Sequence, residues 1–76
     1  MDNFIKILSE IYEVEPDGIV ANTDFRNEID GFNSLIGFSI MIMMEDEYNA
    51  RVSVEEFLEC KTVGDLYGKC VKEENA

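Results

Sequence analysis

The spacing of apolar residues near the start of the chain is that of an amphipathic helix. Apolar side chains stand at positions 4, 5, 7, 8, 11 and 12, and polar side chains fill positions 6, 9, 10 and 13. Apolar residues three and four apart lie on one face of a helix, so the pattern predicts a helix over about residues 3–13. The turn-forming sequence of residues 15–18, which includes Pro16, predicts its end.

A long connection follows, residues 19–31, and it is too apolar for a free linker. We expect its four large apolar side chains to hold it against the core: Ile19, Val20, Phe25 and Ile29. The Asn-Thr-Asp sequence of residues 22–24 favours a short turn of helix around Phe25. The connection is therefore expected to pack on the helices.

The second helix is predicted from a ten-residue run, residues 35–44, that is almost entirely apolar. We place this helix over residues 34–48. Either Asn33 or Ser34 is suited to cap its start, because both residue types accept a hydrogen bond from the first helical N–H groups. Asn49 is suited to the left-handed conformation that commonly ends a helix.

The apolar run leaves open which of its side chains are buried. A helix that is apolar all round is normally buried, but 76 residues cannot bury every face, so some of Ile36, Ile42 and Met43 should be exposed. An exposed apolar patch usually marks a surface for a partner. Met41, Met43 and Met44 give the helix an adaptable lining that either fills the core or yields to a guest chain.

Two capping patterns predict two further helices. Ser53 with Glu56 forms a capping box, and Thr62 with Asp65 repeats it with a shorter acid. No segment shows the alternation of a strand. We therefore predict an all-α fold, a small four-helix bundle with a long loop between helices one and two, formed by residues 1–76 as one domain with residues 73–76 frayed. The expected core comprises Phe4, Leu8, Ile11, Phe25, Phe38, Met41, Tyr48, Val54, Phe57, Val63 and Leu66.

Charge and composition narrow the possible functions. The net charge of −11 would repel nucleic acid and anionic membrane surfaces, so neither is an expected partner. The chain has no histidine, the usual general base and commonest metal ligand, so we expect no catalytic residues and no metal site. No secretory signal opens the sequence. Cys60 and Cys70 make a poor disulfide framework, and together these features indicate a reduced, cytoplasmic monomer.

Ser34 is the strongest candidate for a functional residue in this sequence. At the start of a helix its hydroxyl would lie among free backbone N–H groups at the positive end of the helix dipole, where an attached phosphate is tolerated. The simpler interpretation is that Ser34, or Asn33 before it, only caps the helix. The surrounding sequence decides between these two interpretations.

The ordered set of motifs along residues 4–71 resembles an acyl carrier protein. The residues that carry the resemblance are Phe25 in the loop, Gly31-Phe32-Asn33-Ser34-Leu35 at the candidate site, Glu45-Asp46-Glu47-Tyr48 at the end of helix two, then Val52, Glu55-Glu56-Phe57 and Thr62-Val63-Gly64-Asp65-Leu66. Asn-Ser-Leu alone is too short to be specific. The whole set at this spacing is what identifies the family.

The resemblance implies a function and a cofactor. Ser34, flanked by Asn33 and Leu35, would receive 4′-phosphopantetheine from a phosphopantetheinyl transferase, and the thiol of that arm would carry an acyl or aminoacyl group as a thioester. The protein would be no enzyme itself. It would present its cargo to acyl-loading and acyl-transfer enzymes that have basic docking patches, through Ile36, Ser39, Glu45, Asp46 and Glu47 of helix two.

Three departures from the family pattern indicate a specialised carrier. Asn33 replaces the family's aspartate, Ile36 and Ser39 replace acidic residues of the first two turns, and one extra residue separates Phe25 from Ser34. The loss of charge beside the site puts recognition by a housekeeping transferase in doubt.

Two other functional classes are alternatives to a carrier. One is a non-enzymatic, acidic helical adaptor without a prosthetic group, in which Ser34 is a simple cap. The other is a calcium-binding helix pair, which needs oxygen ligands at fixed positions of a twelve-residue loop. Starting from Asp24, the third position is Arg26 and the sixth is Ile29, so the pattern fails.

Overall fold

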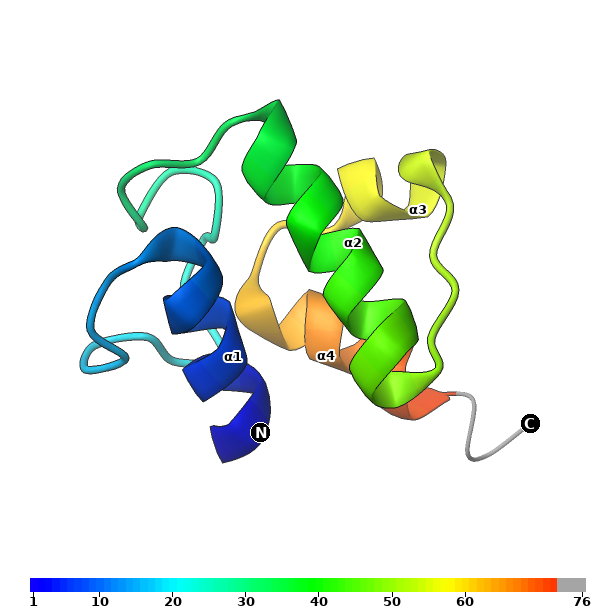
Figure 1. The fold of residues 1–76 in the computed structure, drawn as a ribbon, viewed down its shortest axis with the longest axis horizontal. Coiled ribbons are helices and arrows are strands. Elements are labelled where there is room, and N and C mark those ends of the chain that lie inside the picture. The colour runs from blue at the N-terminus through cyan, green and yellow to red at the C-terminus, as the bar shows by residue number, and fades with distance from the viewer. Residues whose placement is uncertain (73–76) are drawn as a thin grey trace.

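The computed structural model describes residues 1–72, with the side chain of Lys72 excepted, and shows four α-helices around one core. They are α1 (Asp2–Tyr12), α2 (Ser34–Tyr48), α3 (Val54–Glu59) and α4 (Val63–Lys72) (Figure 1). No strand occurs in the described part of the chain, where an isolated bridge joins Asp24 to Thr62. The prediction of an all-α bundle with a long first loop is confirmed. The expected fraying of residues 73–76 falls outside the described residues.

The helix ends follow local sequence signals. Asn49 has φ 53° and ends α2 in the left-handed conformation, as predicted. Ser53 and Glu56 form the reciprocal capping box of α3. The Asp65 carboxylate accepts the Thr62 N–H at 3.2 Å while the Thr62 hydroxyl accepts the Asp65 N–H at 3.1 Å, so an aspartate completes the same device at α4. The first helix ends at Glu13, a left-handed residue with φ 60°, before the Pro-containing turn that was expected to end it.

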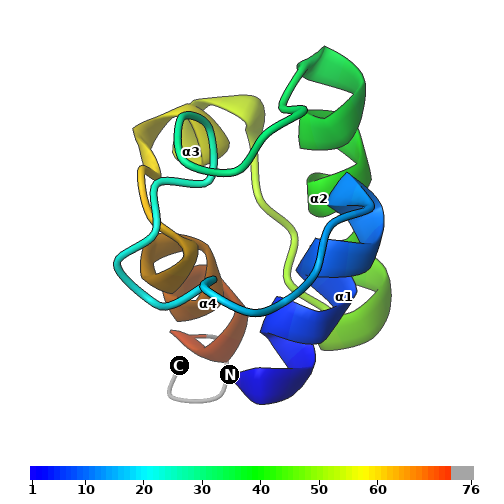
Figure 2. The ribbon, with the colours of Figure 1, turned by 90° about the vertical axis from the view of Figure 1, so that its left-hand side faces the viewer.

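The connection between α1 and α2 is packed on the helices, as expected. Figure 2 shows it running from α1 past α4 and α3 to the start of α2. Ile19, Phe25 and Ile29 are buried, whereas Val20 is exposed, contrary to expectation. The backbone N–H groups of Val63 and Gly64 donate hydrogen bonds to carbonyls of the loop and attach it to the start of α4. Residues 24–28 make hydrogen-bonded turns and no helix.

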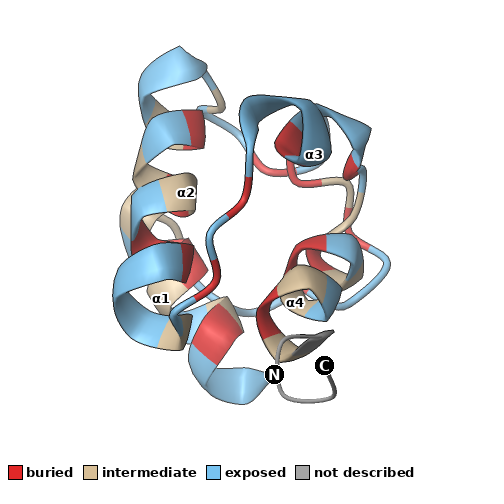
Figure 3. Ribbon diagram, turned by 90° about the vertical axis from the view of Figure 1, so that its right-hand side faces the viewer, coloured by how far each residue is buried: buried red, intermediate tan, exposed pale blue. Residues whose placement is uncertain are grey.

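Burial is concentrated on the inner faces of the helices (Figure 3). Most of the expected core is buried or half-buried. Phe38 and Val54 are the exceptions, with 57% and 54% of their surface exposed, so their placement in the core was wrong. Within α2, Ile42 is exposed, Ile36 is half-buried, and Met43 and Met44 lie in the core. The buried methionines thus fill the core, and half-buried Met41 remains beside a surface groove.

Seven of the eight aromatic rings form two groups inside the bundle. Phe4, Tyr48 and Tyr67 pack edge to face at one end, with centroids 5.5–6.2 Å apart. The second group joins the loop to α1 and α3: Tyr12, Phe25, Phe32 and Phe57. The Tyr12 hydroxyl donates to the Phe25 carbonyl, and burial raises the pKa of its phenol. None of the described helices combines the length and apolarity that a bilayer span requires.

Candidate functional site at the start of helix two

The start of α2 is fixed by Asn33, which settles the question of its cap. Gly31, with φ 100°, turns the chain into the helix, and Asn33 follows in an extended conformation. The Asn33 side-chain oxygen accepts the Ile36 N–H at 2.9 Å, and its backbone carbonyl accepts the Gly37 N–H at 3.0 Å. Asn33 is therefore the cap, and Ser34 is the first residue of the helix.

This division of roles leaves Ser34 available for chemistry. Its side chain is exposed, and within residues 1–72 no hydrogen bond engages its hydroxyl. Over the same residues, the backbone N–H groups of Ser34 and Leu35 also have no protein acceptor. Unpaired N–H groups at a helix start attract anions, and the helix dipole adds to the effect. A phosphodiester on this hydroxyl would lie in a favourable field.

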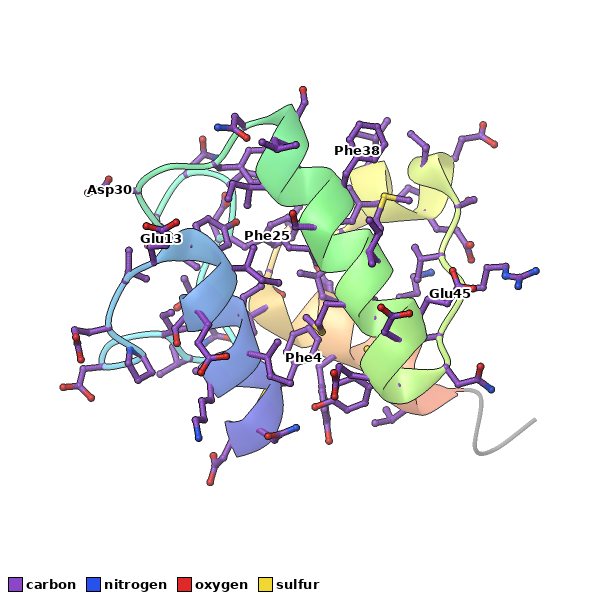
Figure 4. The ribbon with its side chains drawn as sticks, viewed as in Figure 1. Phe4, Glu13, Phe25, Asp30, Phe38 and Glu45 are labelled. Carbon is purple, nitrogen blue, oxygen red and sulfur yellow. The ribbon has the colours of Figure 1, made fainter. Side chains whose placement is uncertain are left out.

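A groove of about 200 Å³ begins beside Ser34 and runs between α2 and α3. Phe32 and Phe57 form its inner side, while Phe38 and Leu58 stand at its outer edge. Figure 4 shows Phe38 projecting from α2 toward α3 and Phe25 inside the bundle. The full lining is Phe32, Ser34, Gly37, Phe38, Met41, Val54, Phe57 and Leu58. An apolar groove that includes the serine gives a flexible arm attached there a surface to lie on.

A half-buried cation, Arg26, contacts the aromatic rings of this groove and was missed by sequence analysis. The Arg26 guanidinium is 4.6 Å from the centroid of the Phe25 ring and 5.4 Å from that of Phe57. It donates hydrogen bonds to the backbone carbonyls of Phe57, at 2.8 Å, and Cys60. These carbonyls end α3, where a positive charge is favoured. The available signal was a lone basic residue beside an apolar loop position.

We call the exposed apolar side chains of α2 and α3 on the side of Ser34 the apolar ridge. It is formed by Leu35, Phe38 and Ile42 of α2 with Val54 and Leu58 of α3, each more than half exposed. Sequence analysis placed two of these five residues, Phe38 and Val54, in the core. Large exposed apolar patches on small proteins usually mark a binding surface.

The partner-binding residues predicted from the sequence are not part of the apolar ridge. Ser39, Asp46 and Glu47 line a second groove of about 300 Å³ between α1 and α2, together with Ile7, Ile11, Ile42 and Met43. Glu45 is exposed at the end of α2 and pairs with Arg51 at 3.4 Å (Figure 4). Both partners of that pair are more than half exposed, so it contributes little to stability. At 1.5 Å per residue, the acids begin about 16 Å along the helix from Ser34.

The two cysteines do not belong to the groove. Cys60 and Cys70 are free and buried. Desolvation raises the pKa of both thiols, that of Cys70 to about 11. Their role in the structure is to fill the core beside α3 and α4.

Comparison with known proteins places these features in a family context. A family model described as a phosphopantetheine attachment site matches residues 2–70. An acyl carrier protein of Lactobacillus acidophilus is 34% identical over 59 residues, which is 78% of this chain and 72% of that protein. The meromycolate extension acyl carrier proteins of Mycobacterium tuberculosis and Mycolicibacterium smegmatis are 31% and 29% identical over 72 residues, or 92% of this chain. The chain spans 62% of the M. tuberculosis protein and 72% of the M. smegmatis protein.

Proposed function

This chain belongs to the acyl carrier protein family, and from that membership we propose that Ser34 is the residue to which its 4′-phosphopantetheine is attached. Members of the family are carriers and no enzymes, and their prosthetic group is bound covalently. The observation that carries the proposal is that Asn33, and not Ser34, caps the start of the helix. Asn33 caps α2, and the exposed Ser34 hydroxyl, which has no hydrogen-bond partner among residues 1–72, lies at the mouth of an apolar groove.

The residues around Ser34 fit such a group. When bound, 4′-phosphopantetheine supplies a thiol that holds an acyl or aminoacyl group as a thioester. The N–H groups of Ser34 and Leu35, which have no acceptor in the described part of the chain, and the dipole of α2 favour the negative phosphodiester. The groove between α2 and α3 offers apolar surface to the arm. The family match does not favour the alternative of an adaptor without a prosthetic group.

We infer that this carrier serves a dedicated pathway. Asn33 stands where the family has aspartate, and the first turn of α2 contains no acidic residue. Some relatives are named for one pathway, as meromycolate extension acyl carrier proteins. Residues 1–76 are proposed as a single carrier domain. The free thiols of Cys60 and Cys70 suit a reducing compartment such as the cytoplasm, and mutual repulsion at a net charge of −11 favours a monomer.

Partner docking is proposed along α2, against enzymes that carry basic patches. The apolar ridge begins next to Ser34, and the exposed acids Glu45, Asp46 and Glu47 lie at the far end of the helix. Half-buried Ile36 and Ser39 lie on the same helix. The ridge would supply the contact that holds the complex, while the acids would attract the partner's basic patch over a distance.

The attachment proposal is tested by intact mass. Incubation with coenzyme A and a broad-specificity phosphopantetheinyl transferase should add the mass of one phosphopantetheinyl group to the parent and none to Ser34→Ala. Ser39→Ala is the matched control, because it removes another serine hydroxyl of α2, and it should be modified like the parent. Addition to Ser34→Ala, or none to the parent with several transferases, would overturn the proposal.

The docking proposal is tested by binding kinetics with the same transferase. Changing Glu45 and Glu47 to lysine should slow association, by a factor that shrinks as salt rises. Phe38→Ala should speed dissociation and cost more than about 1 kcal/mol of binding free energy. Val20→Ala is the control, because Val20 is equally exposed, at 56%, but lies in the loop. The binding kinetics of Ile36→Ala can be compared only after a melting curve has shown that the variant is folded, because Ile36 also packs against the core. Equal dissociation of the Phe38 and Val20 variants would refute the role of the ridge.

A further inference from the structure

The groove beside Ser34 is closed at its inner side by two aromatic rings. Phe57 and Phe32 lie against the α2 backbone at Gly37, where a methyl group would stand 3.4 Å from the Phe57 ring and 3.5 Å from the Phe32 ring. Those are ordinary contact distances for the added methyl group, so the space between the helix and the rings would hold one methyl group, and the rings form the floor of the groove between α2 and α3. Behind them Phe25 is fully buried, with its centroid 5.5 Å from that of Phe57 and 6.0 Å from that of Phe32.

Arg26 holds these rings in place. Its guanidinium lies 4.6, 5.4 and 6.0 Å from the centroids of Phe25, Phe57 and Phe32, within the range of cation–π attraction for all three rings. Its two hydrogen bonds end on α3 carbonyls, one of them that of Phe57 itself. Moving the Phe57 ring outward therefore disturbs the cation that contacts the ring and bonds its backbone.

An aliphatic chain that entered the bundle at this point would meet a charged group. Displacing Arg26 would leave the Phe57 and Cys60 carbonyls without their donor and the guanidinium without its acceptors. Unpaired polar groups are costly where they are buried, as the residues Phe57 and Cys60 are, and hydrogen bonds to a charged donor are the more costly ones to lose. An apolar chain offers no hydrogen bonds in exchange. The structure thus opposes entry beyond the aromatic floor through the contacts of Arg26 as well as through the buried Phe25 ring behind it.

We propose that Arg26 locks the aromatic floor of the groove, so that this carrier keeps its cargo at the surface and is suited to short acyl or aminoacyl groups. The inference rests on attachment of the arm at Ser34. The arm and a short acyl group lie in the apolar groove between α2 and α3, and the carbons of a longer chain project into solvent. Arg26 is a positioning residue in this scheme, because it acts through Phe32 and Phe57.

The test compares the melting temperatures of the protein loaded with butyryl, octanoyl and dodecanoyl arms, with loading verified by mass. A chain that enters the core buries more apolar surface with each methylene, and stability then rises with its length. The parent should show the same melting temperature for all three. Arg26→Met keeps an unbranched apolar stem without the charge, and its melting temperature should rise from butyryl to dodecanoyl. Arg26→Lys keeps the charge but loses the planar guanidinium. Its melting temperature should rise less with chain length than that of Arg26→Met.

The controls separate this inference from the proposal on which it rests. Phe57→Leu, which shortens the floor, should also become sensitive to chain length, and Val20→Ala, at an exposed position of the loop outside the groove, should not. In the protein without its arm, Arg26→Met should speed amide hydrogen exchange in α3 severalfold, a result that needs no loading. A parent that gains stability with chain length, or an Arg26→Met variant with unchanged α3 exchange, would overturn the inference. Failure to load Ser34 would instead overturn the attachment proposal.

Discussion

Removal of the Asn33 side chain should weaken α2 at the point where the arm is proposed to attach. The Asn33 oxygen accepts the Ile36 N–H at 2.9 Å and is the side-chain cap of the helix. Replacing such a cap by alanine costs about 1 kcal/mol, within a range of about 0.5–2. For a domain of this size, each kcal/mol lowers the melting temperature by about 4–8 °C. Asn33→Ala should therefore melt about 4–8 °C below the parent.

The aspartate variant separates capping from charge. Aspartate caps as well as asparagine, so Asn33→Asp keeps the hydrogen bond. Its added charge is favoured by about 0.3–1 kcal/mol at a helix start, and this gain is opposed by repulsion within a chain of net charge −11. The two effects offset each other, and we expect a much smaller change in melting temperature than in the alanine variant. The same variant restores the aspartate of the family pattern.

The assay is thermal unfolding followed by circular dichroism at neutral pH and moderate salt. Asn22→Ala, at an exposed position of the loop, is the control for loss of an asparagine side chain. Mass spectrometry of timed samples then compares the rates of phosphopantetheinyl transfer. Asn33→Ala should react more slowly because its first turn frays, and Asn33→Asp at least as fast as the parent. An alanine variant that melts with the parent would refute the capping argument, and an aspartate variant as unstable as the alanine variant would refute the charge argument.

Three further predictions concern charge and protonation. Raising salt from about 0.01 M to about 0.15 M shortens the electrostatic screening length from about 30 Å to about 8 Å, and the longer of these is close to the molecule's longest extent of 33 Å. Repulsion among the negative charges is then weaker, so the melting temperature should rise, and a flat or falling curve would contradict this. Backbone hydrogen bonds from Lys61 and Thr62 lower the pKa of Asp65 from its ordinary value of 3.8, so its contribution to stability is present above that pH and lost as the pH falls below it. Asp65→Asn should consequently lose less melting temperature than the charge-matched Asp46→Asn between about pH 5 and about pH 3; equal losses would count against the argument. Because burial raises the pKa of the Cys60 and Cys70 thiols, both should react slowly with iodoacetamide in the native protein and rapidly in denaturant, and rapid native reaction would show that they are accessible.

The sequence predicted the features of this fold that depend on near neighbours. The bounds of α2, its left-handed end at Asn49 and the two capping devices at α3 and α4 all follow from residues within four positions of one another. The proposed attachment site could be predicted for the same reason, because Asn33, the cap, and Ser34, the first helical residue, belong to the same turn of helix.

The features that were wrong or missed depend on long-range packing. Phe38 was placed in the core because α2 is apolar on every face, and its pattern therefore gives no information on which face is turned inward. Arg26 was missed because its partners, Phe57 and Cys60, lie more than thirty positions away. Val20 was expected in the core, but the loop buries Ile19 and turns Val20 outward.

The apolar ridge and the net negative charge of the chain together determine which surfaces the protein can bind. A surface that includes Leu35, Phe38 and Leu58 would cause most small proteins to self-associate. Here two copies of the chain both have the same excess negative charge, so the electrostatic barrier to contact between like molecules is high. A basic surface cancels that charge on approach, and only then does the ridge become a favourable contact. Near the isoelectric point of about 4.1 the barrier disappears for like molecules too, and colloidal stability should fail there before the fold does.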